Sequence, residues 1–386
     1  MNILFYRYNS ICEPDIIYVL KRLGHDVFEV KDAIENKRMS PEQEVMAVNN
    51  ALKTFDANVV FSVNFFPAVS EVCRIYQTKY ISWIVDAPVM ELYSHSIRNT
   101  CNRVCIFDYS LYEEFRRENP GGVFYVPLAS DVTRLKEVIE SITEEDRNKY
   151  CSDVSFVGSL YTEKCPYNNM KDEGFLRGYL DGVIETQLQV YGYNFIEECI
   201  TDEIVKKYEK NNIIYEFPEK SNANKRAALA QLIVGNKVTE QERIRLLDKL
   251  SKNFEVDIYT ASDLKKLPGL HHKGLAESLV VMPKVFHLSK INLNFTSKPI
   301  KTGLPQRIWD IMGAGGFVLT NYQAEIGNFF EIGKDIEVFA SEQELLDKVD
   351  YYLKNDADRV AIARNGCNKV RKYHSLENRL SQLLSL

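Results

Sequence analysis

The 386-residue sequence predicts an α/β protein with two domains, each built on a parallel sheet. The chain is too long for one ordinary core and suits two domains of about 150–200 residues each. Its first 30 residues alternate strand, helix and strand, which is typical of a parallel sheet with helical crossovers. Hydrophobic residues make up 45% of the chain and charged residues 26%, the balance of a soluble globular protein.

The N-terminal half alternates predicted strands and helices. Several strands run into polar residues, as at Asn64 and Asp86. Polar residues just beyond the carboxyl ends of parallel strands are where ligands bind in open α/β sheets, so this half predicts a binding edge. The expected elements are strands at 2–8, 25–30, 58–63, 80–85, 103–107 and 123–126, and helices at 15–23 and 42–55.

A charged segment separates the two halves. Residues 131–150 (DVTRLKEVIESITEEDRNKY) predict a helix or a linker, and we place the domain boundary at its end. The first domain is therefore expected at 1–150 and the second at 151–370, followed by a last helix within 371–386. The further expected elements are strands at 153–157, 254–259, 291–295, 317–320 and 337–339, and helices over most of 166–250 and at 342–354, 357–373 and 376–384.

Charge and simple motifs argue against several classes of protein. The formal net charge of −6 disfavours a dominant nucleic-acid role, which usually needs a basic face. Residues 7–13, the first strand–helix turn, contain no glycine where a dinucleotide-binding G-x-G-x-x-G should be. A Ser-His-Asp hydrolase is also unsupported, because no G-x-S-x-G elbow is present.

The sequence predicts a cytoplasmic protein. The N-terminal MNILFYRYNS is typical of a strand and lacks the basic region and cleavage site of a signal peptide. No apolar run approaches the roughly 20 residues of a membrane span. The eight Cys form no CxxC pair, which favours free thiols in a reducing compartment.

The stretch from Lys301 to Asn321, KTGLPQRIWDIMGAGGFVLTN, holds the most candidate site residues. Gly303 and Leu304 form a turn that opens a helix at Pro305, which suits a first helical turn because its missing N–H is not needed there. Free backbone N–H groups at a helix start bind phosphate oxygens. The stretch therefore predicts a phosphate site, with an ordinary helix of Pro start and Gly stop as the alternative.

Two side chains of this helix extend the candidate site. Arg307, in the first turn, adds a forked donor for the same phosphates. Asp310 lies a turn further in and is placed to accept ribose or sugar hydroxyls. Gly313, Gly315 and Gly316 then end the helix and allow it to pack closely on the next strand.

This stretch resembles the donor-site motif of the CgeB-like (spore-maturation-protein) glycosyltransferases, relatives of the large retaining GT-B families. Those families carry two acidic residues separated by seven others, and the two positions fall on Thr302 and Asp310. The first acid is therefore absent, so the retaining mechanism does not carry over directly. The resemblance implies a GT-B fold, in which two Rossmann-like domains with parallel sheets face a central cleft and the last helix crosses back to the N-terminal domain.

The resemblance extends over most of the chain. Residues 156–161 (FVGSLY) and 289–294 (SKINLN) are similar to donor-side strands of the family, and 83–88 (WIVDAP) and 126–129 (VPLA) to its acceptor-side domain. The C-terminal domain is thus expected to hold most of the nucleotide-sugar donor. The expected donor-binding residues are Gly158, Ser159, Tyr161, Lys273, Asn294, Thr302, Gly303, Leu304, Pro305, Arg307 and Asp310.

Residue chemistry adds to three of these assignments. Gly158 and Ser159 follow a strand and can bring backbone N–H groups toward a pyrophosphate, although an ordinary turn has the same sequence. In residues 271–274 (HHKG) the paired His lack a third metal ligand at useful spacing. We therefore expect a loop there, in which Lys273 neutralises phosphate.

No catalytic metal and no other cofactor are expected. A metal-dependent GT-A enzyme carries an Asp-x-Asp motif after a strand. The triplet from Asp356 to Asp358 instead lies between two late helices, where Asp358 suits a helix start. The nucleotide-sugar itself is a substrate.

An inverting reaction needs a general base for the acceptor proton. The candidates are Glu13, after the first strand, and Asp86, after the fourth. Glu13 beside Pro14 also suits a helix-start charge, and Asp86 before Ala-Pro also suits a turn cap. A retaining reaction needs no separate protein base, because the donor phosphate can accept the proton, so the sequence leaves the outcome open.

The function predicted is transfer of a sugar from a nucleoside-diphosphate-sugar to a glycan, a lipid carrier or a protein. These are the expected partners, and nucleic acid is not among them. A non-catalytic sugar-nucleotide-binding or scaffolding protein on the same frame is an alternative that Thr302 supports. A second alternative is a sugar-nucleotide epimerase of GT-B shape, which would convert the donor without an acceptor.

Overall fold

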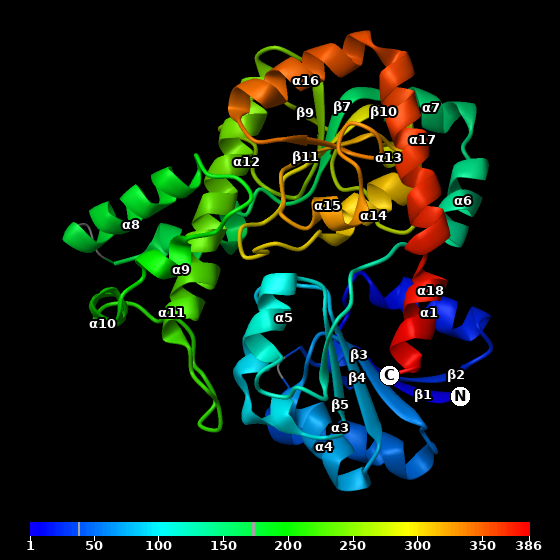
Figure 1. Cartoon of the computed structure of the whole chain (residues 1–386), viewed down its shortest axis with the longest axis vertical. Helices are drawn as coiled ribbons and strands as arrows, with labels where there is room; N and C mark the ends of the chain where they lie inside the picture. The colour runs from blue at the N-terminus through cyan, green and yellow to red at the C-terminus, as the bar shows by residue number, and fades with distance from the viewer. Residues whose placement is uncertain (38, 172–173) are drawn as a thin grey trace. The chain divides into compact units, whose positions relative to one another are not determined.

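The computed structural model describes residues 1–37, 39–171 and 174–386. The chain divides into two compact units (Figure 1). Unit 1 contains Met1–Asp131, Phe217–Ala223 and His374–Leu386, and unit 2 contains Val132–Glu216 and Asn224–Tyr373.

The final helix, α18 (Leu376–Leu384), belongs to the unit that begins the chain. The Leu376 N–H donates to the Ser130 carbonyl at 2.8 Å, and Glu377 pairs with Arg22 at the end of α1 (Glu13–Arg22). The two ends of the sequence therefore pack in the same unit.

Unit 1 is built on a parallel sheet whose inner strands are buried. All of β3 (Val59–Val63) is buried, and so is β1 (Asn2–Tyr6) after its first residue. Continuous apolar runs of this kind are typical of a parallel sheet covered by helices on both faces. Across the described residues six strands pair in the order β2, β1, β3, β4, β5, β6, with β2 at Asp26–Val30, β4 at Lys79–Ile84, β5 at Asn102–Ile106 and β6 at Val123–Tyr125.

The helices of unit 1 include two that were not predicted, α4 (Pro67–Tyr76) and α5 (Tyr109–Phe115). Both start three or four residues after the last residue of a strand. Pro67 occupies the first turn of α4, and the Asp108 side chain caps α5 by accepting the Leu111 N–H. The remaining helices are α2 (Asp32–Glu35), α3 (Pro41–Thr54) and the 3-10 turns Met90–Tyr93 and His95–Arg98.

Unit 2 is built on a second parallel sheet. In the part of the chain that the structure describes, its strands pair in the order β12, β11, β10, β7, β8, β9. The central strands β7 and β10 were both predicted, as were their neighbours. Their bounds are Ser152–Val157 (β7), Val256–Tyr259 (β8), His271–His272 (β9), Ser289–Asn294 (β10), Val318–Asn321 (β11) and Glu337–Phe339 (β12).

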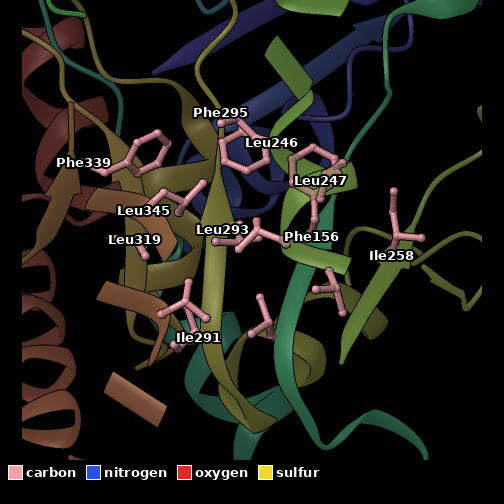
Figure 2. Packing of buried hydrophobic residues seen from close by; sticks show 14 of the residues in the cluster. Phe156, Leu246, Leu247, Ile258, Ile291, Leu293, Phe295, Leu319, Phe339 and Leu345 are labelled. Carbon is pink, nitrogen blue, oxygen red and sulfur yellow. The ribbon is translucent and has the colours of Figure 1, made fainter. Parts of the chain in front are cut away.

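The hydrophobic core of unit 2 lies along β7 and β10 (Figure 2). Phe156, Leu293 and Phe295 are at most 2% exposed. The rings of Phe156 and Phe295 stack with centroids 5.3 Å apart, and Phe339 meets Phe295 edge-on at 6.0 Å. Burial of each large side chain stabilises the fold by about 1.5–3 kcal/mol. This core fixes the two strands whose carboxyl ends carry the candidate site.

The expectation of a loop at 271–274 is wrong for its first two residues. His271 and His272 form β9 and pair with Asp257 and Ile258 of β8. An edge strand of two exposed residues has no apolar alternation that a sequence could show.

The charged segment 131–150 forms two helices of unit 2, α6 (Val132–Glu140) and α7 (Glu144–Tyr150). The region 166–250 is mostly helical, as predicted, although residues 172 and 173 lie outside the described part. No helix in the described ranges is long and apolar enough to cross a membrane. The later helices are α8 (Phe175–Gln187), α9 (Ile196–Cys199), α10 (Asp202–Glu209), α11 (Lys225–Ala228), α12 (Asn236–Ser251), α13 (Val281–Leu288), α14 (Gln306–Gly313), α15 (Ile326–Phe329), α16 (Glu342–Lys354) and α17 (Asp356–Tyr373).

Candidate functional site

The loops after the central strands of unit 2 carry most of the predicted donor residues. β7, β10 and β11 are parallel neighbours, so their carboxyl ends meet at one edge of the sheet. Residues 158–161, 295–303 and 321–325 follow these ends, and α14 begins soon after the second loop. This edge is where open α/β sheets bind ligands.

Helix α14 starts directly after Pro305, as predicted. Pro305 has φ −68° and ψ 156°, an extended conformation that suits the residue before a helix, and the Ile308 N–H donates to its carbonyl at 3.1 Å. Leu304 is buried, and its carbonyl accepts a bond from Trp309 Nε1 at 3.4 Å. The first-turn N–H groups have no acceptor within the helix, which makes this start suitable for phosphate.

Arg307 reaches from this first turn to α13. Its Cζ lies 5.2 Å from the centroid of the Phe286 ring, and its Nη1 lies 2.9 Å from Sδ of Met282. A ring face and a thioether favour a guanidinium but carry no negative charge. Burial lowers the pKa of Arg243 and the positive charge of Arg307 adds to this effect, whereas Tyr161, Glu242 and Glu163 act in the opposite direction. Two neighbouring cations favour the binding of an anion such as phosphate.

Asp310 and the glycines complete the helix. Asp310 is half-buried, and its Oδ1 accepts a bond from Gln306 Nε2 at 2.8 Å. Gly315 has φ +78°, which residues with a side chain rarely adopt. A Cβ at Gly316 would lie 2.4 Å from the Phe286 carbonyl oxygen, closer than any real contact. The helix end is therefore closely packed, but the nearest neighbour at Gly316 belongs to α13 and not to the next strand as predicted.

Thr302, where the resemblance implies an acid, contacts an acid from another loop. Its Oγ1 donates to Glu325 Oε1 at 2.6 Å, and the Glu325 N–H donates to the Thr302 carbonyl at 3.3 Å. Glu325 is only 4% exposed. The sequence analysis missed this carboxylate because it lies 23 positions later in the chain, after β11.

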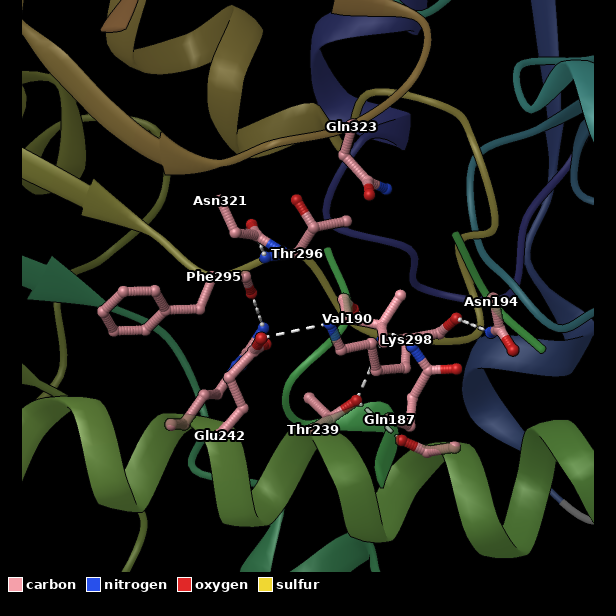
Figure 3. A network of polar contacts seen from close by, with 12 residues as sticks. Gln187, Val190, Asn194, Thr239, Glu242, Phe295, Thr296, Lys298, Asn321 and Gln323 are labelled. Carbon is pink, nitrogen blue, oxygen red and sulfur yellow. Dashed lines mark hydrogen bonds and ion pairs between the residues drawn. The ribbon is translucent and has the colours of Figure 1, made fainter. Parts of the chain in front are cut away.

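Alternate residues from the end of β11 onward hold the loop that precedes α14, and Figure 3 shows two of them, Asn321 and Gln323. The Asn321 Oδ1 accepts the Thr296 N–H at 2.8 Å, and Gln323 Nε2 donates to the Gly303 carbonyl at 3.3 Å. Glu325 continues the same series. Three side chains from one strand end thus fix the approach to the helix start.

The loop after β7 uses many of its polar groups internally. The Gly158 N–H donates to the Tyr259 carbonyl at 3.0 Å. The Ser159 hydroxyl donates to Glu163 Oε1 at 2.5 Å and accepts the Tyr161 N–H at 2.8 Å. Tyr161 has φ +67°, which is uncommon for a residue other than glycine. The Gly158 N–H is used by a hydrogen bond of the sheet. A pyrophosphate bound at this loop would therefore contact other groups of the loop.

Arg243 of α12 joins this loop to the loop after β10. Its Nη1 donates to the Ser159 carbonyl and its Nη2 to the Phe295 carbonyl, both at 2.6 Å. Its Cζ lies 4.8 Å from the centroid of the Tyr161 ring. Nothing in the sequence distinguishes Arg243 from the other charged residues of α12, so the structure adds it to the site.

Polar groups at the end of β10 bond within the protein (Figure 3). Asn294 Nδ2 donates to Thr320 Oγ1 at 2.9 Å and so links β10 to β11. Lys298 and Glu242 form a buried ion pair, with Nζ 3.0 Å from Oε1. Asn194 Nδ2 donates to the Lys298 carbonyl at 2.7 Å. Asn294 is therefore held in a structural network at the predicted donor edge.

Lys273 lies apart from the other predicted donor residues. It follows β9, and β7 and β8 separate that edge strand from β10. Its Nζ is 3.4 Å from Asp257 Oδ2, and its N–H donates to the Ile258 carbonyl at 2.9 Å. The structure therefore gives Lys273 an ion pair at the far edge of the sheet.

In unit 1, Glu13 is fully buried at the start of α1. Its Oε2 lies 3.1 Å from Arg7 Nε, and its two oxygens accept the N–H groups of Tyr8 at 2.8 Å and Asn9 at 3.2 Å. This carboxylate holds the loop after β1, in line with the helix-start alternative.

Asp86 is exposed after β4 and contacts a residue that the sequence analysis did not select. Its Oδ2 accepts a bond from Asn64 Nδ2 at 2.8 Å, and the same amide donates to the Tyr8 hydroxyl at 2.8 Å. Asn64 was noted as a polar strand end, but only the sheet order places it between the other two. The structure thus assembles a second candidate cluster in unit 1.

No group of three or more His, Cys, Asp or Glu that could hold a metal occurs within the residues described. Asp356 is the first residue of α17, and its Oδ1 lies 2.6 Å from Arg359 Nη1. Asp358 accepts a bond from the Tyr351 hydroxyl at 2.6 Å. The Asp-x-Asp triplet therefore belongs to a helix start, as predicted.

The C-terminal part of the chain is similar to one known family. Residues 243–385 match a family model described as glycosyl transferase-like. The matched segment contains Arg243, β10, and α14 with Arg307 and Asp310. A search of curated proteins found no match.

Solved structures share the fold of the whole chain at low sequence identity. A glycosyltransferase from Rickettsia africae has a TM-score of 0.54 and 11% identity, over 100% of this chain and 97% of that chain. HepE of Anabaena with UDP-glucose gives 0.52 and 10%, over 100% and 98%. BGT of T4 phage with its UDP-glucose substrate gives 0.51 and 10%, over 100% of both chains. The chain thus has the predicted GT-B fold, and its residues 243–385 match the glycosyl transferase-like family model.

Proposed function

We propose that this protein is a CgeB-like glycosyltransferase that moves a hexosyl group from a nucleoside-diphosphate-sugar to a hydroxyl acceptor. The observation that carries the proposal is the start of α14, where Pro305 opens the helix and Arg307 adds a guanidinium within the segment that matches the family model. Such a helix start and such a cation bind phosphate oxygens. Two proteins of the same fold were solved with UDP-glucose, which supports a nucleoside-diphosphate-hexose donor.

Unit 2 acts on the leaving group in this proposal. The bond between the anomeric carbon and the donor's phosphate oxygen breaks, and its electron pair leaves with the nucleoside diphosphate. Arg307 and the first-turn N–H groups of α14 stabilise the developing negative charge. Asp310 binds a hydroxyl of the donor, because a carboxylate is the wrong partner for a phosphate, and the buried Glu325 holds Thr302 in the turn before Pro305.

The reaction is proposed to need no metal cofactor, because side chains supply the positive charge. Arg307 and Arg243 are near enough that the charge of the first lowers the pKa of the second. In many phosphate-transferring sites a divalent cation fills this role. Two guanidiniums at the donor edge are suited to do so here.

Unit 1 supplies the base, and its contacts favour Asp86 over Glu13. The Glu13 carboxylate is buried and holds Arg7 and two backbone N–H groups. Asp86 is exposed at the sheet edge. It takes the proton of the acceptor hydroxyl while that oxygen bonds to the anomeric carbon, a single displacement that inverts the configuration at this carbon.

The proposal is tested by assaying the purified full-length protein with UDP-, GDP- and dTDP-sugars. Glycan, lipid-linked and peptide acceptors are offered, each with and without EDTA. We expect one donor to be consumed with one acceptor class, at a rate that EDTA changes by less than about twofold. Donor binding without consumption would show a non-catalytic protein, and conversion of the donor without an acceptor would show an epimerase.

A further inference from the structure

Three polar side chains meet at the carboxyl ends of three neighbouring strands in unit 1. Tyr8 follows β1, Asn64 follows β3 and Asp86 follows β4, and the sheet places these strands side by side in the order β1, β3, β4. Open α/β sheets bind their ligands at this edge.

Asn64 is the centre of this cluster and makes four side-chain hydrogen bonds. Its Oδ1 accepts the N–H of Val85 at 3.1 Å and that of Asp86 at 3.4 Å. Its Nδ2 donates to the Tyr8 hydroxyl and to Asp86 Oδ2, each at 2.8 Å. Both backbone N–H groups can bond only to an acceptor. The Asn64 amide must therefore direct Oδ1 toward them and Nδ2 toward Tyr8 and Asp86, which gives it a single orientation.

The backbone of Asn64 shows that the side chain is needed for these bonds rather than for the turn. Asn64 has φ +58°, and its N–H donates to the Trp83 carbonyl at 2.8 Å. Glycine adopts such a φ without steric cost, and asparagine is one of the few other residues that does so readily. A glycine would therefore keep the turn and lose only the four bonds.

The Asn64 amide holds the Tyr8 hydroxyl, which can donate a hydrogen bond, beside the Asp86 carboxylate, which accepts one. The Tyr8 hydroxyl accepts from Asn64 and also has a hydrogen bond with the Ser10 side chain, and as a hydroxyl it carries one hydrogen that can donate. Burial raises the pKa of Tyr8, and the charge of Asp86 raises it further, which keeps the phenol protonated. Asp86 offers carboxylate oxygens in an exposed position. A sugar carries adjacent hydroxyls that both donate and accept.

Aromatic rings and charge narrow the class of ligand. The half-exposed Phe66 lies with its ring centroid 5.3 Å from that of Tyr8 and 4.8 Å from that of Tyr6. Rings with a polar edge suit a ligand that has both apolar and hydroxyl faces. The negative charge of Asp86 repels a phosphate group, which disfavours a lipid phosphate.

We infer that Tyr8, Asn64 and Asp86 form an acceptor subsite for an uncharged carbohydrate, in which Asn64 is the positioning residue that aims the Asp86 carboxylate. This inference rests on the proposed function. In the reaction, Asp86 takes the proton of one carbohydrate hydroxyl, the oxygen bonds to the donor's anomeric carbon, and the nucleoside diphosphate leaves with the electron pair. Tyr8 donates to a neighbouring oxygen of the same sugar.

The test compares Asn64→Gly and Asn64→Asp in the full-length protein. Gln77→Gly is the matched control, because Gln77 has a similar φ of +55° at the exposed end of α4. Initial rates are measured with the donor that the wild type uses and with methyl glucoside, methyl galactoside, undecaprenyl phosphate and a Ser-containing peptide as acceptors.

We expect Asn64→Gly to lower kcat with a methyl glycoside at least about tenfold, since a misaimed base loses much of its catalytic effect. The donor KM stays within about twofold, because donor binding does not use the acceptor subsite. Asn64→Asp loses more than Asn64→Gly, because a second carboxylate then faces Asp86. Gln77→Gly behaves as the wild type.

Unchanged kcat in Asn64→Gly overturns the inference, and so does a weaker binding of the donor by more than about twofold in this variant, which would show a structural defect. Transfer to undecaprenyl phosphate or the peptide but to neither glycoside also overturns it. If no nucleotide-sugar is consumed or bound, the proposed function fails. Saturation-transfer NMR of the methyl glycosides with wild type and Asn64→Gly then still decides whether the subsite exists.

Discussion

At the scale of single residues, Glu325 shows how a buried carboxylate shapes the donor edge. It accepts the Thr302 hydroxyl at 2.6 Å and is 4% exposed. Hydrogen bonds to charged groups contribute about 1.5–3 kcal/mol, more than those between neutral groups. This bond fixes the turn that leads to Pro305, so its loss is expected to act on donor use.

We predict that Glu325→Ala lowers kcat/KM for the donor on the order of tenfold, the scale of one charged hydrogen bond. The control is Glu331→Ala, since Glu331 is 63% exposed and pairs with Lys334 on the surface. Steady-state kinetics with varied donor decide the point. A Glu325→Ala enzyme as efficient as the control would remove Glu325 from the site.

Sequence and structure differ at this scale for a definite reason. Arg307 and Asp310 could be predicted as candidates because the helix start that presents them is encoded within a few residues. Glu325 and Arg243 were missed because their partners lie 23 and 84 positions away. Only the order of the strands in the sheet brings such residues together, and that order cannot be read from a single sequence.

At the scale of elements, α12 presents two arginines with different roles. Arg243 donates to the Ser159 and Phe295 carbonyls and thereby ties two loops together. Arg245 lies two residues further along α12 and pairs with Glu185 on the surface. Both of these side chains are more than a third exposed. Exposed ion pairs of this kind contribute little to stability.

We predict that Arg243→Met lowers the free energy of unfolding by about 2–3 kcal/mol, because two carbonyls lose a charged donor. Arg245→Met is expected to cost less than about 1 kcal/mol. Urea unfolding followed by circular dichroism measures both. Equal losses for the two variants would contradict the role given to Arg243.

A contact between the helices α7 and α13 predicts that the stability of the protein depends on pH. Asp146 of α7 lies 2.8 Å from Lys284 of α13, and it accepts the Thr143 N–H at 2.9 Å. The hydrogen bond with Lys284 is the main cause that lowers the pKa of Asp146 from 3.8 to about 2. A carboxylate with a lowered folded-state pKa stabilises the fold above its unfolded pKa and loses this effect as the pH falls through the folded value.

We predict that Lys284→Met lowers the Tm at pH 7 and that its difference from the wild type narrows as the pH falls from about 4 to about 2. Thermal unfolding at pH 7, 4 and 3 follows this difference. Lys290→Met serves as control, because Lys290 pairs with Asp153 and both side chains are 46% exposed. A difference that stays constant down to pH 3 would show that the ion pair is not its cause.

The elements themselves were predicted where their sequence signal was long. Buried strands such as β3 and amphipathic helices such as α16 lie within a residue or two of their expected bounds. Helices α4 and α5 were missed because only two or three residues separate each of them from the strand before it. β9 was missed because two exposed residues show no pattern.

At the scale of the whole molecule, both units place polar side chains at the carboxyl edge of a parallel sheet. Unit 1 gathers Tyr8, Asn64 and Asp86, and unit 2 presents the start of α14 with Arg307. The strand–helix alternation predicted this two-sheet fold, because each buried strand and each crossover helix is a local pattern. The side chains that complete each edge depend on strand order and were found only in the structure.

The central claim is that the start of α14 binds the donor's diphosphate through Arg307. Isothermal titration of UDP, GDP and dTDP into wild type, Arg307→Ala and the exposed-site control Arg364→Ala tests it most directly. We predict that one nucleotide binds the wild type and Arg364→Ala equally and binds Arg307→Ala at least about tenfold more weakly, the scale of one charge-assisted contact. Equal Kd values for all three proteins would contradict the account.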